Sequence, residues 1–153
     1  MNDIDITLYP NIIQYPDKRL RVRAFPLDVV KDRVKIDSIA SDMRLVLDKA
    51  AGIAAPQFGE QSCMIGVWYG LEKLILVNPE IIKVSEQTFV SDEGCLSIDE
   101  GKAVYSVVRH KIVKVKALDL QGNSVTYKGR GVLGQAFQHE IDHLNGILLV
   151  DKK

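Results

Sequence analysis

Two histidines near the C-terminus are spaced so that they could hold one metal ion. In Gln138-His139-Glu140-Ile141-Asp142-His143, residues four apart lie on the same face of a helix, so both imidazoles can reach a common ion. Glu140 lies one step further around the helix, where it can exchange a proton with water beside that ion. Zinc hydrolases use this spacing. The motif predicts His139 and His143 as metal ligands and Glu140 as the acid-base residue.

The same pair could instead be two unrelated histidines on a solvated helix face. Two features favour the metal site. The chain has three histidines, and two of them form this pair. Apolar residues also flank the pair on both sides, so the rings are expected to approach the core, where an unpartnered polar ring is costly. A metal ion would be the partner.

A catalytic tetrahedral zinc site needs a third protein ligand and one open position. The candidates are Cys95, Cys63, His110 and several carboxylates. Cys95 lies in a polar, turn-like segment just after the end of an expected strand. Cys63 begins an apolar run typical of a core, and His110 lies between two basic residues of an alternating strand, where we expect it at the surface. Cys95 is therefore the preferred third ligand.

The elements that must position these residues follow from apolar periodicity. Apolar residues recur at helical spacing from Asp37 or Ser38, the expected caps, to Gly52, the expected stop. Strand-like apolar runs follow, separated by turns: Met64–Trp68, Leu74–Val77, Ile81–Val84, Val104–Val108 and Ile112–Ala117, with a hairpin turn at Gln121–Asn123. A second helical stripe, 132–147, carries the histidine pair and has Gly146 near its end. We expect an α+β fold in which antiparallel β-sheets pack around a central C-terminal metal-binding helix, with another helix in the N-terminal half.

Length and composition set further bounds. A chain of 153 residues fits one domain spanning 1–153. Twenty basic residues balance twenty acidic ones, so we expect no direct binding of nucleic acid or anionic membranes. No apolar run is long enough to cross a bilayer, and the acidic start Met1–Asp5 is unlike a signal peptide. We therefore expect a cytoplasmic protein whose two cysteines, Cys63 and Cys95, stay reduced.

A third segment, Gly52-Ile53-Ala54-Ala55-Pro56-Gln57, follows the first expected helix. Its small residues let another backbone approach, and its proline fixes a turn that presents the glutamine. In this order and at these separations, Gly52–Gln57, Glu93–Ser97 and Gln138–His143 resemble the three motifs of the peptide deformylase family. The resemblance covers nearly the whole chain, and it also includes Tyr15–Leu20, Asn78-Pro79 and Asp142–Gly146.

The resemblance implies a metal-dependent hydrolase that removes the N-formyl group from the N-terminal methionine of newly synthesised peptides and releases formate. It implies that Cys95, His139 and His143 hold one divalent ion, Fe²⁺ in the cell and Zn²⁺, Ni²⁺ or Co²⁺ in purified protein. Glu140 would act as base and then as acid. The side-chain amide of Gln57 and the backbone N–H of Leu96 would stabilise the developing oxyanion.

The resemblance also implies how the substrate binds. An extended peptide would pair its backbone with Ala51 and Gly52 as an added strand. Its methionine side chain would enter an apolar pocket, for which Val132 and Ala136 are candidates, although both suit a plain core equally well. The resemblance further implies an ion pair that steadies Glu93. Arg109 is the candidate partner, and the alternative is an exposed strand arginine.

Two positions depart from the family pattern. Ala50 stands where the first turn glycine usually lies, and Asp99 follows Ile98 where many members have proline. Ala50 could narrow the substrate cleft, and Asp99 could loosen the loop after Cys95. Many relatives continue beyond the position of Lys153 into an extension, so we expect a compact member of the family and leave a ribosome contact open. We also expect a monomer.

Two other functions stay open on the sequence alone. A zinc peptidase shares the helix motif, but such enzymes complete the site with His or Glu and cleave internal amides. A non-catalytic domain could use Cys95, His139 and His143 as a structural zinc site. A closed structural site needs a fourth protein ligand, however, and no further Cys or His is well placed.

Overall fold

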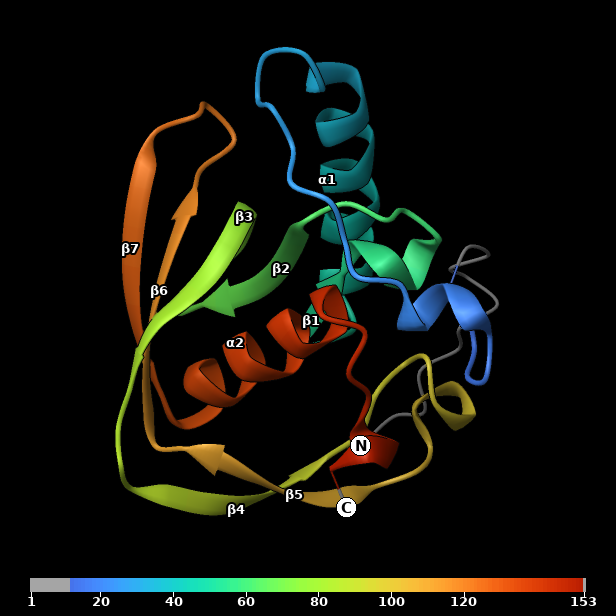
Figure 1. Cartoon of the computed structure of the whole chain (residues 1–153), viewed down its shortest axis with the longest axis vertical. Coiled ribbons are helices and arrows are strands. Elements are labelled where there is room, and N and C mark those ends of the chain that lie inside the picture. The colour runs from blue at the N-terminus through green and yellow to red at the C-terminus, as the bar shows by residue number, and fades with distance from the viewer. Residues whose placement is uncertain (1–11, 153) are drawn as a thin grey trace.

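Two antiparallel sheets pack against the C-terminal helix in the computed structural model, which describes residues 12–152 (Figure 1). The larger sheet has the strand order β1-β2-β3-β6-β7, with β1 (Gly52–Ala54), β2 (Met64–Tyr69), β3 (Glu72–Val84), β6 (Ile112–Leu118) and β7 (Ser124–Arg130). The smaller sheet pairs β4 (Thr88–Glu93) with β5 (Tyr105–His110). The helices are α1 (Arg33–Leu47) and α2 (Gly131–Leu144). The expected α+β fold with a central C-terminal helix is confirmed.

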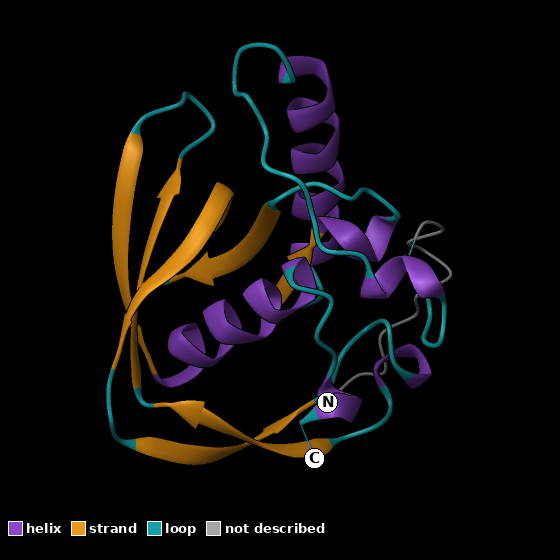
Figure 2. Cartoon of the chain, in the orientation of Figure 1, coloured by secondary structure: helices purple, strands orange, loops and turns teal. Residues whose placement is uncertain are grey.

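Short 3-10 turns lie between and beside these helices and strands (Figure 2). They are η2 (Lys18–Arg21), η3 (Ala55–Phe58), η4 (Asp99–Gly101) and η5 (Leu149–Asp151). The turn η3 follows β1 directly, and η4 lies just after the Cys95 segment. Two of the three motif segments are therefore partly irregular backbone, held between regular elements.

α2 is central because it is apolar on the face it turns to the large sheet. Strand β6 alternates, with Val113, Val115 and Ala117 buried and the lysines between them exposed. These buried residues form one cluster with Phe137 and Ile141 of α2. Burying such side chains stabilises the fold by about 1.5–3 kcal/mol each. The helix that carries the histidine pair is thus held by the sheet core.

α1 packs on the opposite face of the large sheet from α2, because alternate residues of β2 and β3 are buried under each helix. The start of α1 differs from the prediction. The helix begins at Arg33, before the expected caps Asp37 and Ser38, and ends at Leu47 rather than at Gly52. Its buried residues lie at helical spacing: Ile36, Ile39, Ala40, Met43, Val46 and Leu47. The first turn, 33–36, contributes one residue to this set, Ile36. The chain just before the helix is held by Asp28 and Asp32, whose carboxylates accept hydrogen bonds from the backbone N–H groups of residues 28, 30 and 31.

Three strand predictions also need correction. The expected strands 74–77 and 81–84 are one strand, β3, which bends at register shifts around Asn78 and Pro79. Asn78 has a φ of 52°, and its side chain exchanges two 2.8 Å hydrogen bonds with the Leu27 backbone. The strand expected at 104–108 is β5 and continues to His110. Gly52–Ala54, expected as a turn, forms the short strand β1.

The remaining predictions concern the hairpin turn, the end of the second helix, a membrane span and the N-terminus. The hairpin at 121–123 joins β6 to β7 as expected, and α2 ends beside Gly146. Among residues 12–152, no helix is long and apolar enough to span a membrane. The prediction about the acidic start Met1–Asp5 lies outside the described residues.

Candidate metal centre

Three buried side chains from two distant segments meet at the C-terminal part of α2. One ligand atom each from Cys95, His139 and His143 lies within 4.8 Å of the other two. The Cys95 sulfur is 3.2 Å from Nε2 of His143, and the two imidazole centroids are 5.2 Å apart. Cys95 follows the end of β4, which places it beside the helix. The structure therefore brings together the three residues that the sequence suggested as ligands.

Glu93 and Arg109 fix the orientation of the His139 ring. Oε1 of Glu93 lies 2.9 Å from Nδ1 of His139, which leaves Nε2 of that ring for the metal site. Arg109 is buried and donates to both oxygens of Glu93, at 2.7 and 2.9 Å. A further hydrogen bond of 2.7 Å joins Arg109 to Asp142 on α2. Burial alone would raise the pKa of Glu93, but the hydrogen bonds from Arg109 and His139 hold that pKa at about 2.

Electrostatics at the three candidate ligands favour a cation. Burial lowers the pKa of His143 well below its usual value, so its ring is a neutral donor of an electron pair. Burial would also lower the pKa of His139, but the negative charge of Glu140 and the contacts with Cys95 and Glu93 raise it well above the usual value. Positive charge is thus stabilised at this position. A sulfur, two imidazole nitrogens and nearby carboxylates fit a divalent transition-metal ion.

Glu140 lies beside the candidate ligands with its carboxyl group against the backbone of β1. A Cβ atom added at Gly52 would be 2.5 Å from Oε2 of Glu140, so any side chain at this position would displace the carboxyl group. Oε1 of Glu140 is buried and has no hydrogen-bond partner among the described residues. Burial raises the pKa of Glu140 to about 7. This carboxyl group is therefore poised to exchange protons near neutral pH.

Hydrogen bonds fix the side-chain amide of Gln57 next to Cys95. Its side-chain oxygen accepts a 3.0 Å hydrogen bond from Ala54 N–H, and Nε2 donates to Oγ of Ser97 at 3.0 Å. Nε2 also lies 3.6 Å from the Cys95 sulfur, so its second N–H faces the candidate ligands. Among residues 12–152, no protein acceptor takes the backbone N–H of Leu96. The Gln57 amide thus donates toward the candidate ligand Cys95, and the adjacent Leu96 N–H has no protein acceptor among these residues.

The candidate substrate residues lie on two elements. Ala51 is exposed, and Gly52 begins β1, an edge strand whose one strand partner within residues 12–152 is β2. Val132 is in the first turn of α2 and is 72% exposed. Ala136 is buried in the core cluster between α2 and the sheet. The two pocket candidates are therefore in different environments.

Sequence reasoning left three supporting residues without a role. Gln138 exchanges two 2.9 Å hydrogen bonds with the His110 backbone, which fastens α2 to β5. His110 is in turn partly buried, with Nδ1 2.8 Å from the Ser85 carbonyl oxygen. Asp142 holds Arg109, and Ser97 holds Gln57. These three residues, Gln138, Asp142 and Ser97, lie within the motifs, and that position was the only signal in the sequence.

Comparison with known proteins agrees with this geometry. Residues 9–153 match the sequence model of the Polypeptide deformylase family. The peptide deformylase of Buchnera aphidicola subsp. Schizaphis graminum is 39% identical over 144 residues, which are 92% of this chain and 84% of that protein. The peptide deformylase of Dictyoglomus thermophilum is 37% identical over 138 residues, 89% of this chain and 87% of that protein.

Solved structures show the same relationship. A class I type b peptide deformylase from Acinetobacter baumannii has a TM-score of 0.86 at 33% identity, covering 93% of this chain and 97% of that chain. A Met-Ala-Ser-bound structure of the class I type b peptide deformylase from the same organism has a TM-score of 0.86 at 30% identity, covering 93% and 96%. Sequence, fold and the meeting of the three motifs agree, and the chain belongs to the polypeptide deformylase family.

Proposed function

We propose that this protein is a metal-dependent hydrolase that removes the N-formyl group from the N-terminal methionine of newly synthesised peptides and releases formate. The observation that carries the proposal is the buried meeting of Cys95, His139 and His143, with Glu140 beside them. Family membership supports the same reaction. We assign the activity to a single domain that acts as a monomer in the cytoplasm, where newly synthesised chains are made.

Cys95, His139 and His143 would hold one divalent ion and leave a position open for water or substrate. This ligand set suits Fe²⁺, which we propose for the cell, and also Zn²⁺, Ni²⁺ or Co²⁺ in purified protein. The bound ion would act as a Lewis acid that activates water and polarises the formyl carbonyl group. The Glu93 carboxylate supports this role because it fixes the ring of His139.

Glu140 performs the proton transfers. Its carboxylate accepts a proton from the attacking water, and the resulting carboxylic acid returns a proton to the nitrogen of the leaving amine. A pKa of about 7 suits both steps, because the carboxyl group must change protonation state twice in each turnover. The close backbone of Gly52 keeps the carboxyl group at the ligand side of the helix.

Gln57 and Leu96 stabilise the negative oxygen that forms when the formyl carbon becomes tetrahedral. One N–H of Gln57 Nε2 is directed at the Cys95 sulfur at 3.6 Å, and the N–H of Leu96 has no protein acceptor among residues 12–152. Losing one such donor typically lowers the rate by about 100- to 1,000-fold. The Ser97 hydroxyl fixes the amide, so no reorganisation is needed during the reaction.

The peptide binds as a strand added beside Ala51 and Gly52, at the edge of β1 to which no strand of residues 12–152 is paired. The bound Met-Ala-Ser of the Acinetobacter relative supports recognition of a short peptide that begins with methionine. We propose that Val132 and Ala136 border the methionine side chain. Val132 is open to solvent and available for contact, whereas Ala136 would contribute only from its buried position.

Release of formate from a formylated methionyl peptide tests the proposal. The metal-loaded protein should release formate from that peptide and leave the unformylated peptide intact. A zinc peptidase would cleave both peptides at an internal bond, and a structural zinc domain would cleave neither. Anaerobic preparation with Fe²⁺, compared with Zn²⁺ loading, would show which ion gives the higher turnover.

A further inference from the structure

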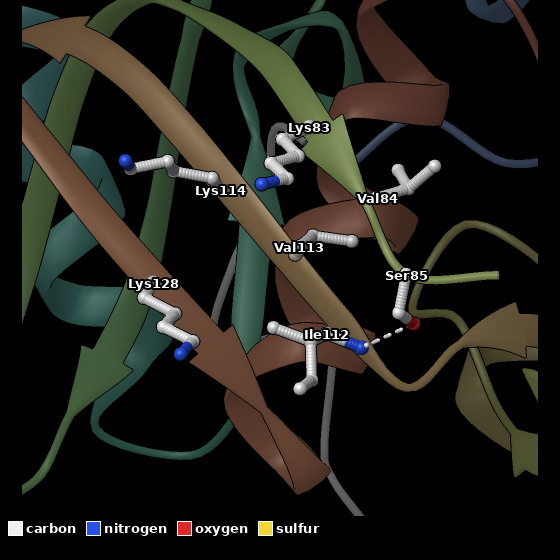
Figure 3. Close-up of a pocket in the computed structure, with 7 residues that line it drawn as sticks. All are labelled: Lys83, Val84, Ser85, Ile112, Val113, Lys114 and Lys128. Carbon is white, nitrogen blue, oxygen red and sulfur yellow. Dashed lines mark hydrogen bonds between the residues drawn. The ribbon is translucent and has the colours of Figure 1, made fainter. Parts of the chain in front are cut away.

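Three lysines lie side by side on the outer face of the large sheet (Figure 3). Lys83 of β3 is directly opposite Lys114 of β6, which is directly opposite Lys128 of β7. The neighbours of Lys114 along β6, Val113 and Val115, are buried toward α2, so the lysine points away from the helix and the metal centre. All three lysines are exposed, and we call them the lysine row.

The lysine row works against the stability of the sheet. Like charges directly opposite each other on neighbouring strands repel, and none of the ion pairs found within residues 12–152 involves these lysines. On the same face, Glu80 is directly opposite Lys116, so that row has a compensating charge. The chain has as many acidic as basic residues. The lysine row is thus a local concentration of positive charge.

Two adjoining hollows extend this positive surface. The lysine row lines a hollow of about 310 Å³ together with the side chains of Val84 and Ile112 (Figure 3). A second hollow, of about 340 Å³, shares Ile112 and is lined by Lys111 and Arg130. No acidic residue lines either hollow. Five cationic side chains therefore border a recessed surface on one side of the molecule.

We propose that the lysine row and its hollow bind the phosphate backbone of RNA. Strands lie about 4.8 Å apart, so the first and third lysines start roughly 10 Å apart and can reach several successive phosphates. Lysine binds phosphate as a mobile point charge, which needs no fixed base sequence. The RNA backbone presents a narrow row of phosphates that can enter a recessed surface, whereas the surface of a bilayer is flat. The choice of RNA rests on the proposed function, because newly synthesised peptides arise beside RNA.

The neutral total charge led us to expect no nucleic-acid contact, and the lysine row revises that expectation because local charge governs such contacts. Three phosphate contacts to single-stranded RNA predict a slope of about −2 in a plot of log affinity against log salt concentration. Affinity should then fall about 20-fold between 50 and 200 mM salt. Binding should be independent of RNA sequence.

Binding of a fluorescent single-stranded RNA to the metal-loaded protein, measured across this salt range, tests the proposal. The variant K83Q/K114Q/K128Q should bind at least about 10-fold more weakly at 50 mM salt, with a slope near zero. The matched control K31Q/K35Q/K49Q removes three exposed lysines around α1 and should bind within about 2-fold of the parent protein. Formate release should be unchanged in both variants. The variant K83Q/K114Q/K128Q should melt at the same temperature as the parent protein or at a higher one.

Several outcomes would overturn the proposal. Equal weakening of RNA binding in both variants would show that total charge alone governs binding. Absence of RNA binding by the parent protein would refute the proposal. Binding of anionic phospholipid vesicles in preference to RNA would assign the surface to a membrane. If the triple variant failed to fold, K114Q alone should still reduce the salt slope by about 0.7. Loss of formate release with intact RNA binding would contradict only the proposed function.

Discussion

At the scale of single residues, the position of Glu140 determines its chemistry. Its carboxyl group is buried, has one oxygen without a hydrogen-bond partner among the described residues, and has a pKa of about 7. An exposed glutamate on the same helix would be ionised throughout the neutral range. Glu140 can therefore gain and lose a proton during turnover, while the neighbouring histidines keep their nitrogens for the ion.

Replacing Glu140 by glutamine should abolish turnover and leave the metal bound. The amide has nearly the same shape but cannot accept a proton, so we expect formate release to fall by about 100- to 10,000-fold. Metal content and formate release would be measured on the same sample, with the exposed Glu72→Gln as the control. Turnover within a few-fold of the parent protein would rule out Glu140 as the base.

Glu93 should contribute stability that disappears in acid. Its pKa of about 2 lies below the ordinary value of 4.5, so the unfolded chain takes up this proton first as the pH falls. The contribution is therefore complete above about pH 4.5 and is lost as the pH falls toward 2. Urea unfolding of the metal-free protein at several pH values would measure it.

The control for this prediction is Glu93→Gln, which cannot titrate. Other carboxyl groups with lowered pKa also destabilise the protein in acid, so the informative quantity is the difference between parent and variant. That difference should shrink between pH 4.5 and 2. A difference that is constant with pH would show that Arg109 and His139 do not hold the Glu93 carboxylate.

At the scale of elements, the site depends on how closely β1 approaches α2. Replacing Gly52 by alanine would put a methyl group 2.5 Å from Oε2 of Glu140, so the carboxyl group must move. A displacement of about 1 Å can lower turnover about 100-fold, and we expect a loss of that size with metal content unchanged. Gly66→Ala on β2 meets only side chains of the core and should lower stability without this loss. Equal turnover losses in both variants would contradict the assignment.

Regular patterns in the sequence predicted these elements well. The 3.6-residue apolar stripe of α2 and the alternation of β6 both reflect burial on one face, which the residue types record directly. The first turn of α1 was missed because it contributes one buried apolar residue, Ile36, while its other apolar residue, Val34, is exposed. The continuity of β3 was missed because Asn78-Pro79 is typical of a turn, whereas here Asn78 is held by the distant Leu27 backbone.

The site shows the same limit. The spacing of His139 and His143 is a local property of a helix and could be predicted from the residues. The contributions of Asp142, Ser97 and Gln138 depend on contacts between segments 28 to 40 residues apart, which local patterns do not record. The burial of Arg109 likewise follows from the packing of β5 against α2, so an exposed arginine was an equally good expectation.

At the scale of the whole molecule, the core under α1 and the core that holds the metal-binding helix are two distinct hydrophobic clusters. Met43 is a residue of α1 and is buried in the cluster between α1 and the sheet. Phe137 is a residue of the metal-binding helix α2 and is buried in the cluster between α2 and the sheet. Met43→Ala should cost about 2–5 kcal/mol of unfolding free energy, and Phe137→Ala about 3–5 kcal/mol. Below the unfolding transition, Met43→Ala should keep metal affinity and turnover. Phe137→Ala should weaken both, because it loosens α2 itself.

Urea unfolding and metal titration of the two variants would separate these effects. If Met43→Ala lowered metal affinity as much as Phe137→Ala does, the two cores could not be treated as independent supports. Matched losses of stability with a difference in metal affinity would agree with the structure.

X-ray absorption spectroscopy of the zinc-loaded protein tests the metal centre most directly. The structure predicts one sulfur ligand at about 2.3 Å and two imidazole nitrogens at about 2.0–2.1 Å from the ion. The sulfur signal should disappear in Cys95→Ser and persist in Cys63→Ser. A spectrum without sulfur, or a sulfur signal that survives the loss of Cys95, would contradict the metal site and the hydrolysis proposed from it.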